Sequence, residues 1–283
     1  MNLQNILSEI ETTDPDVYGR LDTRRNAMKS FAKTSGKIAL ASIPFALGSM
    51  FQKAYASPTA PTDLILDTLN FALTLEYLES NFYIKAVASG IIPAGDATTS
   101  LTTIRDHENE HVNFLKTAIS AAGGTPVSFT ADQFDFTAGG AFANVFTDYG
   151  TLLAVAQTFE DTGVRAYKGQ APNLISNNAY LTAALQIHSV EARHAAHLRE
   201  MRQAAGFLVP SGVTVKPWIT LAESGIATSA VQPSYNGEDN VVQAGVTITN
   251  IGGKNISAAA ASEAFDEPLT KDQVTAIVTP FFK

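Results

Sequence analysis

The strongest constraint on how this chain folds is a motif that occurs twice at almost the same spacing. A Glu-x-x-His motif stands at residues 108–111 and again at 191–194, and another glutamate precedes it, by 32 residues in the first copy and by 31 in the second. Residues three apart on a helix lie on one face, so each motif can direct both side chains at one site. The chain therefore looks like two similar helical hairpins. The six residues of the repeat are Glu76, Glu108, His111, Glu160, Glu191 and His194.

Apolar residues at helical spacing, with breaks at glycine and proline, predict four long helices. They cover about 62–89, 100–122, 142–168 and 178–206. The segment between the second and third helices is aromatic and loop-like, and it is long enough to cross a bundle rather than to make a tight turn. We therefore expect an all-α fold, a four-helix bundle with a long crossover, over residues 57–206.

The composition changes after the fourth predicted helix. Residues 213–215 and 246–249 are rich in valine and threonine and predict short strands, and residues 257–265 predict a short helix. We interpret residues 207–283 as a C-terminal extension that packs on the bundle, with Trp218 as an anchor. A separate small domain is the alternative.

The first 56 residues have the features of an export signal. Arg24-Arg25 precede an apolar run from Ile38 to Phe51, and Ala54-Tyr55-Ala56 gives the small-x-small pattern of a cleavage site. The paired arginines resemble a bacterial twin-arginine signal. The run is shorter than the ~20 residues that a membrane span needs, so none is expected after processing. The alternative is a basic segment that leads into a buried helix.

Charge and cysteine content narrow the function. Without residues 1–56, which hold 7 Lys+Arg and 5 Asp+Glu, the chain has 12 basic and 22 acidic residues and a formal charge of −10. This balance argues against nucleic-acid binding, which needs basic patches to neutralise phosphates. The chain has no cysteine, which excludes disulfides, zinc–thiolate sites and iron–sulfur clusters.

The repeated residues form a set of four carboxylates and two imidazoles. The four negative charges would balance two divalent cations, whereas without metal they would repel one another inside a bundle. Oxygen-rich ligation with two imidazoles suits two iron or two manganese ions. Glu79 lies on roughly the same helix face as Glu76 and could replace it as a ligand.

This ligand pattern resembles that of the ferritin-like superfamily, which includes ferritins, rubrerythrins and manganese catalases. The stretches LEYLESNFY (75–83) and FEDTGVRAYKG (159–169) look like the bacterial ferritin-like domains related to plant desiccation-associated proteins. The resemblance covers about residues 62–206. It implies a ferritin-like four-helix bundle around a dinuclear metal centre.

Several other polar side chains stand near the repeated motifs. Tyr83 and Tyr167 each follow a candidate glutamate by seven residues, which suggests either core aromatics or a hydrogen bond to a ligand, with redox activity as a further option. The histidines outside the repeat are at shifted helical phases, and we expect surface or supporting roles for them: His107, His188 and His197. The acidic residues expected on a solvated face are Asp106, Glu110 and Asp161.

Residues 107–111 also match His-Glu-x-x-His, the zinc-protease motif. The further x-x-Gly-x-x-His pattern is absent, because Phe114 and Thr117 stand in its place. Three functions fit better: a redox enzyme acting on peroxide or dioxygen, a ferroxidase that takes Fe(II), and a structural or desiccation-related stress protein. We expect an exported protein, periplasmic or extracellular, with homo-oligomerisation possible.

Overall fold

The structure is a computed structural model that describes residues 62–207 and 209–283. The predicted export signal lies outside these residues. Within the described part, no helix combines the length and the apolar character that crossing a membrane requires.

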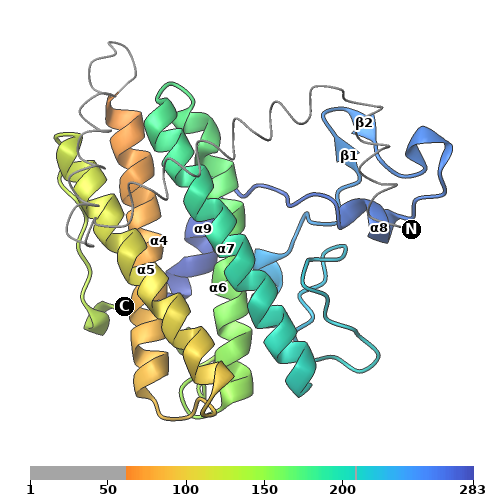
Figure 1. Cartoon of the computed structure of the whole chain (residues 1–283), viewed down its shortest axis with the longest axis horizontal. Helices are drawn as coiled ribbons and strands as arrows, with labels where there is room; N and C mark the ends of the chain where they lie inside the picture. Colours follow the sequence, from red (N-terminus) through yellow and green to blue (C-terminus); the bar gives the residue numbers. More distant parts are fainter. Residues whose placement is uncertain (1–61, 208) are drawn as a thin grey trace, which may run out of the picture. The chain divides into compact units, whose positions relative to one another are not determined.

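Four long helices form the core of the described chain. They are α4 (Thr62–Ala88), α5 (Asp96–Ala121), α6 (Tyr149–Gln170) and α7 (Asn178–Ala205). Helix α4 packs mainly against α5, and α6 packs mainly against α7, so the bundle consists of two hairpins (Figure 1). The predicted all-α four-helix bundle is confirmed.

The ends of the helices follow local capping chemistry. Helix α6 begins at Tyr149, seven residues later than predicted, because Asp148 caps it and accepts a hydrogen bond of 2.7 Å from the Thr151 amide. Helix α7 ends at Ala205 and is capped by Gly206, whose φ of 68° is the left-handed conformation that commonly terminates helices.

The predicted crossover connects α5 to α6 as a long segment without a long helix of its own. It contains one short 3₁₀ helix, η2 (Ala131–Gln133), and its phenylalanines pack on the bundle. Phe136 lies 5.6 Å from the ring of Phe82 on α4, and Phe134 lies 5.1 Å from the ring of Phe282 near the C-terminus. The phenylalanines of the crossover therefore cover apolar surface of the bundle.

The C-terminal part contains short elements. They are η4 (Ser229–Ser234), β1 (Val242–Gln243), β2 (Val246–Thr247), η5 (Ile251–Gly253), α8 (Ala258–Ser262), α9 (Lys271–Val278) and η6 (Thr279–Phe281). The predicted helix at 257–265 is α8, and the predicted strand at 246–249 is reduced to the two residues of β2, paired with β1. The strand predicted at 213–215 was wrong, because the Val215 amide bonds to the Gln203 side chain of α7 instead of to a strand.

Buried polar contacts join this C-terminal part to α6 and α7. Asp161, predicted on a solvated face, is only 4% exposed: it pairs with Arg199 and accepts a hydrogen bond of 2.7 Å from the Tyr235 hydroxyl. That prediction was wrong because residues of the extension cover this face. Asp106 is exposed, as expected, and so is Glu110.

Trp218 is less enclosed than an anchor residue would be. It is 51% exposed and lines a small pocket together with Asp161 and Arg199. The attachment of the extension therefore depends on the buried polar contacts more than on this indole.

Candidate metal centre

The structure brings the six residues of the repeat together in the middle of the bundle. They form two overlapping groups in which the ligand atoms lie within 4.8 Å of one another. The groups are Glu76, Glu108, His111 and Glu191, and Glu108, Glu160, Glu191 and His194. Glu108 and Glu191 belong to both groups, so these two carboxylates lie between the two histidines.

Each hairpin supplies half of the cluster. The first helix of each hairpin gives one glutamate, and the second gives the Glu-x-x-His motif, whose three-residue spacing places both side chains on the inner face. All four carboxylates are 0% exposed. Charged groups are almost never buried to this extent without partners, so the cluster needs compensating charge.

Each histidine directs the same ring nitrogen at the carboxylates. His111 Nδ1 lies 3.0 Å from Glu108 Oε2 and 3.2 Å from Glu76 Oε2. His194 Nδ1 lies 3.0 Å from Glu108 Oε1 and 3.1 Å from Glu160 Oε2. The two halves of the cluster are therefore arranged alike.

At the centre of the cluster the histidine donors are too few for the carboxylate oxygens that face them. Glu108 Oε1, Glu191 Oε1 and Glu191 Oε2 are left without a hydrogen bond of their own. His194 Nδ1 is 3.0 Å from Glu108 Oε1 and His111 Nδ1 is 3.2 Å from Glu191 Oε1, but each nitrogen has at most one proton and faces another carboxylate at a similar distance. A buried polar atom without a partner is costly, and a divalent cation would satisfy these oxygens without needing a hydrogen-bond donor. The donor set thus fits metal ions.

Burial has the largest effect on the pKa values of the cluster, and neighbouring charges and hydrogen bonds modify it. Burial, with the nearby charge of Glu160, raises the pKa of Glu108 to about 7. Burial likewise raises the pKa of Glu160 to about 8, although His194 opposes this shift. Burial lowers the pKa of His194. The charge of Glu160 and hydrogen bonds to the carboxylates outweigh this effect of burial and raise the pKa of His194 to about 12. Without metal, protons therefore neutralise the site.

Two tyrosines donate hydrogen bonds to Glu160 and Glu76, and each tyrosine belongs to the other hairpin from its glutamate. The Tyr83 hydroxyl on α4 donates a hydrogen bond of 2.5 Å to Glu160 Oε1 on α6, and the Tyr167 hydroxyl on α6 donates to Glu76 Oε1 on α4. Both rings are buried. Each tyrosine thus fixes a carboxylate of the hairpin to which it does not belong.

Glu79 is a fifth buried glutamate beside the cluster, but it belongs to neither group, whereas Glu76 does. Burial and then the charges of Glu191 and Glu160 raise its pKa well above the usual value. The internal repeat pairs Glu79 with Gly163, so one half of the site has a carboxylate where the other has no side chain. Aligning the two copies at this position would have revealed this difference.

The other three histidines lie outside both groups. His107 Nδ1 is 3.0 Å from His194 Nε2, His188 Nδ1 is 2.9 Å from the Val164 carbonyl, and His197 Nε2 is 2.9 Å from the Ser100 hydroxyl. A zinc-protease site would need His107 and His111 to share one metal. Neither group contains both, so the cluster does not match that alternative.

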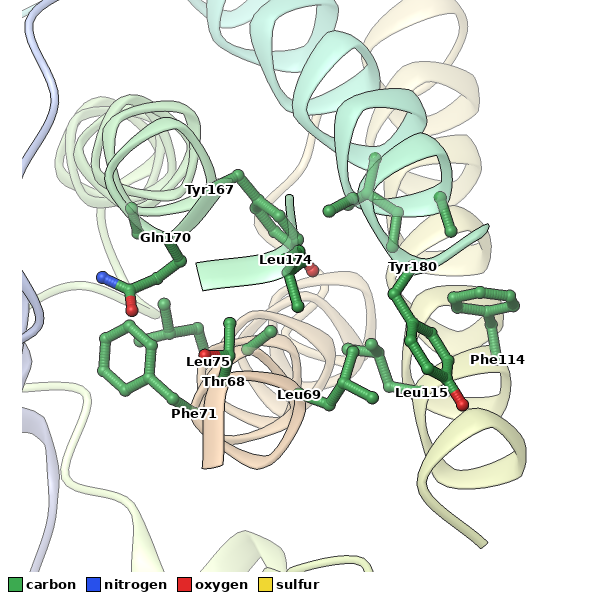
Figure 2. Close-up of a pocket in the computed structure, with 15 residues that line it drawn as sticks. Thr68, Leu69, Phe71, Leu75, Phe114, Leu115, Tyr167, Gln170, Leu174 and Tyr180 are labelled. Carbon is green, nitrogen blue, oxygen red and sulfur yellow. The ribbon is translucent and has the colours of Figure 1, made fainter. Parts of the chain in front are cut away.

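A small apolar cavity lies next to the cluster. It has a volume of about 20 Å³, room for roughly one water-sized molecule. Figure 2 shows side chains from α4, α5, α6 and α7 around it, among them Leu75, Leu115 and Tyr167. Tyr167 also bonds Glu76, so this residue connects the cavity to the cluster.

A comparison with protein-family models agrees with this geometry. A comparison with curated proteins found no match. A family model described as a ferritin-like domain matches residues 65–204, which span α4 to α7 apart from a few residues at the two outer ends. The match covers all six residues of the cluster and both tyrosines, and the chain thus carries a ferritin-like domain of the ferritin-like superfamily.

Proposed function

We propose that this protein binds a dinuclear iron or manganese centre between α4, α5, α6 and α7 and uses it in redox chemistry with hydrogen peroxide or dioxygen. The observation that carries the proposal is that Glu108 and Glu191 belong to both ligand groups. Carboxylates shared in this way can bridge two metal ions. A site for one metal ion would not require the second group of ligands.

The donor set assigns each metal position its own residues. Glu76 and His111 would hold one ion, Glu160 and His194 the other, and the two shared glutamates both. Four carboxylates balance the charge of two divalent ions, and this mixture of oxygen and imidazole donors suits iron or manganese.

The bound metal pair would supply two electrons, the number that cleaving a peroxide O–O bond requires. The chain contributes the surroundings. The bundle keeps the carboxylates from bulk water, and Tyr83 and Tyr167 hold Glu160 and Glu76 in place. The apolar cavity at Tyr167 suits a small neutral oxidant better than a charged one, because its lining lacks charged side chains.

The proposal includes export of the folded protein. Residues 1–56 carry the paired arginines, the apolar run and the small-x-small site that support a twin-arginine signal. Such a pathway suits a protein that acquires its metal before leaving the cytoplasm. Intact mass of the exported protein tests this, with Ser57 as the expected first residue; a full-length exported chain contradicts it.

The decisive experiment is anaerobic loading with Fe(II) or Mn(II), followed by stopped-flow mixing with each oxidant. Metal oxidation with iron indicates ferroxidase or peroxidase activity, and oxygen release with manganese indicates catalase-like activity. Glu160→Ala should abolish the reaction, whereas Glu110→Ala, on the exposed face of α5, should leave it intact. A fully loaded site that reacts with neither oxidant rejects the redox proposal and leaves a structural or stress-related role.

A further inference from the structure

One contact breaks the symmetry between the two halves of the cluster. His107 is an exposed residue of α5, and its Nδ1 lies 3.0 Å from Nε2 of the buried His194. The two ring planes are nearly parallel, inclined by 14° with centroids 5.2 Å apart, so the rings lie edge to edge as a hydrogen bond between their nitrogens requires. The internal repeat pairs His107 with Val190 of α7, whose side chain can accept no hydrogen bond. His194 thus has an imidazole partner of a kind that the repeat does not provide for His111.

The direction of this hydrogen bond follows from the other nitrogen of His194. His194 Nδ1 faces the carboxylates of Glu108 and Glu160, at 3.0 and 3.1 Å. A histidine that ligates a metal through Nδ1 presents a lone pair there, so its proton must be on Nε2. His194 Nε2–H then donates to His107 Nδ1. His107 accepts, and its own proton is on Nε2.

We propose that His107 is a positioning residue that holds His194 in the tautomer and ring orientation required for metal binding, and that it makes the two metal positions unequal in affinity. The position served by His194 is the tighter one. A second partner of this kind on a ligating histidine typically changes metal affinity by about 10- to 100-fold. This inference rests on the proposed metal binding but adds an order of filling that the six ligands alone do not give.

Two substitutions separate the hydrogen bond from the bulk of the ring. His107→Phe keeps a flat ring beside His194 but removes the acceptor. His107→Asn places an amide oxygen near the position of the imidazole Nδ1 and keeps an acceptor. His197→Ala is the matched control, since His197 is another exposed histidine, whose partner is the Ser100 hydroxyl outside the cluster.

The experiment is titration of the metal-free full chain with Mn(II), with free Mn(II) measured by electron paramagnetic resonance. The native chain should bind two ions in two distinguishable steps. His107→Phe should weaken one step by about 10- to 100-fold and leave the other unchanged, and His107→Asn should restore most of the loss. Thermal unfolding of each metal-free variant checks that it still folds, so that a weaker binding step reports on the site and not on loss of the bundle.

A second experiment, in a His194→Ala background, tests whether His107 affects Mn(II) affinity through His194. His194→Ala removes the residue on which His107 is proposed to act, so adding His107→Phe should cause no further loss of Mn(II) affinity. A further loss there, an equal weakening of both steps, or no effect of His107→Phe in the native chain would overturn the inference while leaving two-metal binding in place. A native chain that takes up neither Mn(II) nor Fe(II) would overturn the proposed function itself, and this inference with it.

Discussion

The carboxylate of Glu79 on α4 occupies the space that a side chain at Gly163 on α6 would enter. A Cβ atom built on Gly163 would lie 3.3 Å from Glu79 Oε1, closer than an ordinary van der Waals contact. The two residues occupy equivalent positions of the internal repeat, one with a buried carboxylate and one with no side chain at all. The missing side chain in one half therefore makes room for the extra carboxylate in the other.

This relationship predicts an unusual response to Gly163→Ala. Alanine normally stabilises a helix interior by about 0.5–1 kcal/mol relative to glycine. Here the new methyl group would press on Glu79, so we expect a smaller gain or a net loss in the native background and the full gain in a Glu79→Ala background. Urea unfolding of the metal-free native chain, the two single variants and the double variant measures the coupling energy between positions 79 and 163. An equal gain in both backgrounds would show that the contact does not matter.

Metal-free protein should lose stability as the pH rises from about 5 to about 9. The folded pKa values of Glu108 and Glu160, about 7 and 8, lie above the usual 4.5, so their stabilising contribution is complete below pH 4.5 and is lost as the pH rises through these values. The raised pKa of His194 acts in the same direction between its usual 6.5 and about 12. Urea midpoints across this range test the sign, and a rising midpoint would contradict it.

The same protonation predicts that metal binding releases protons. Ions must displace the protons of the histidines and of part of the glutamates, so metal affinity should increase with pH over this range. Calorimetric titration with Mn(II) in buffers of different ionisation enthalpy measures the number released. The absence of proton release would show that the cluster is already deprotonated without metal.

Loss of a ligand should reduce metal content, and loss of His107 should not. His111→Ala and Glu191→Ala should each bring metal well below two ions per chain, because each removes a member of the cluster. His107→Ala should leave the content near two at saturating metal, since His107 belongs to neither group. Elemental analysis after desalting decides this. If His107→Ala strips the metal and Glu191→Ala does not, the zinc-protease alternative gains support.

The hydrogen bonds of the two tyrosines should contribute equally to the unfolding free energy of the metal-free protein. Tyr83→Phe and Tyr167→Phe each remove a hydroxyl that donates to a buried glutamate, at an expected loss of about 1–3 kcal/mol of unfolding free energy in the metal-free protein. Tyr149→Phe is the control, because Tyr149 packs on Phe207 away from the cluster. A loss for one tyrosine only would mean that the two halves are less alike than their geometry indicates.

The bundle and its cluster could be predicted because the information is local and repeated. Spacing of three residues on a helix fixes which side chains share a face, and finding the spacing twice indicated two equivalent hairpins. The environment of Asp161 could not be predicted, since it depends on Tyr235, which is 74 residues away in sequence. The start of α6 was misplaced because residues 142–147 form turns, and an apolar pattern does not by itself distinguish turns from helix.

Arg165 of α6 makes several buried contacts with the extension. Its guanidinium pairs with Glu238 at 2.7 Å and donates to the backbone carbonyls of Ser234, Asn236 and Glu267 at 2.6, 2.9 and 2.8 Å. Arg165 is 1% exposed, and Glu238 is also 1% exposed. One bundle side chain therefore holds two separate stretches of the extension.

Arg165→Met should leave Glu238 buried without its cation, and removing one partner of such a pair typically destabilises by about 3–5 kcal/mol. Adding Glu238→Gln should recover part of the loss, because no unpaired charge then remains. Arg105→Met is the control: its pair with Asp106 is on the surface, where ion pairs contribute only about 0–1 kcal/mol. Urea unfolding measures the energies, and limited proteolysis should show faster cleavage within 209–283 in Arg165→Met than in the native chain. A loss below about 1 kcal/mol, with unchanged cleavage, would mean that the other contacts, such as that of Tyr235 with Asp161, hold the extension on the bundle without Arg165.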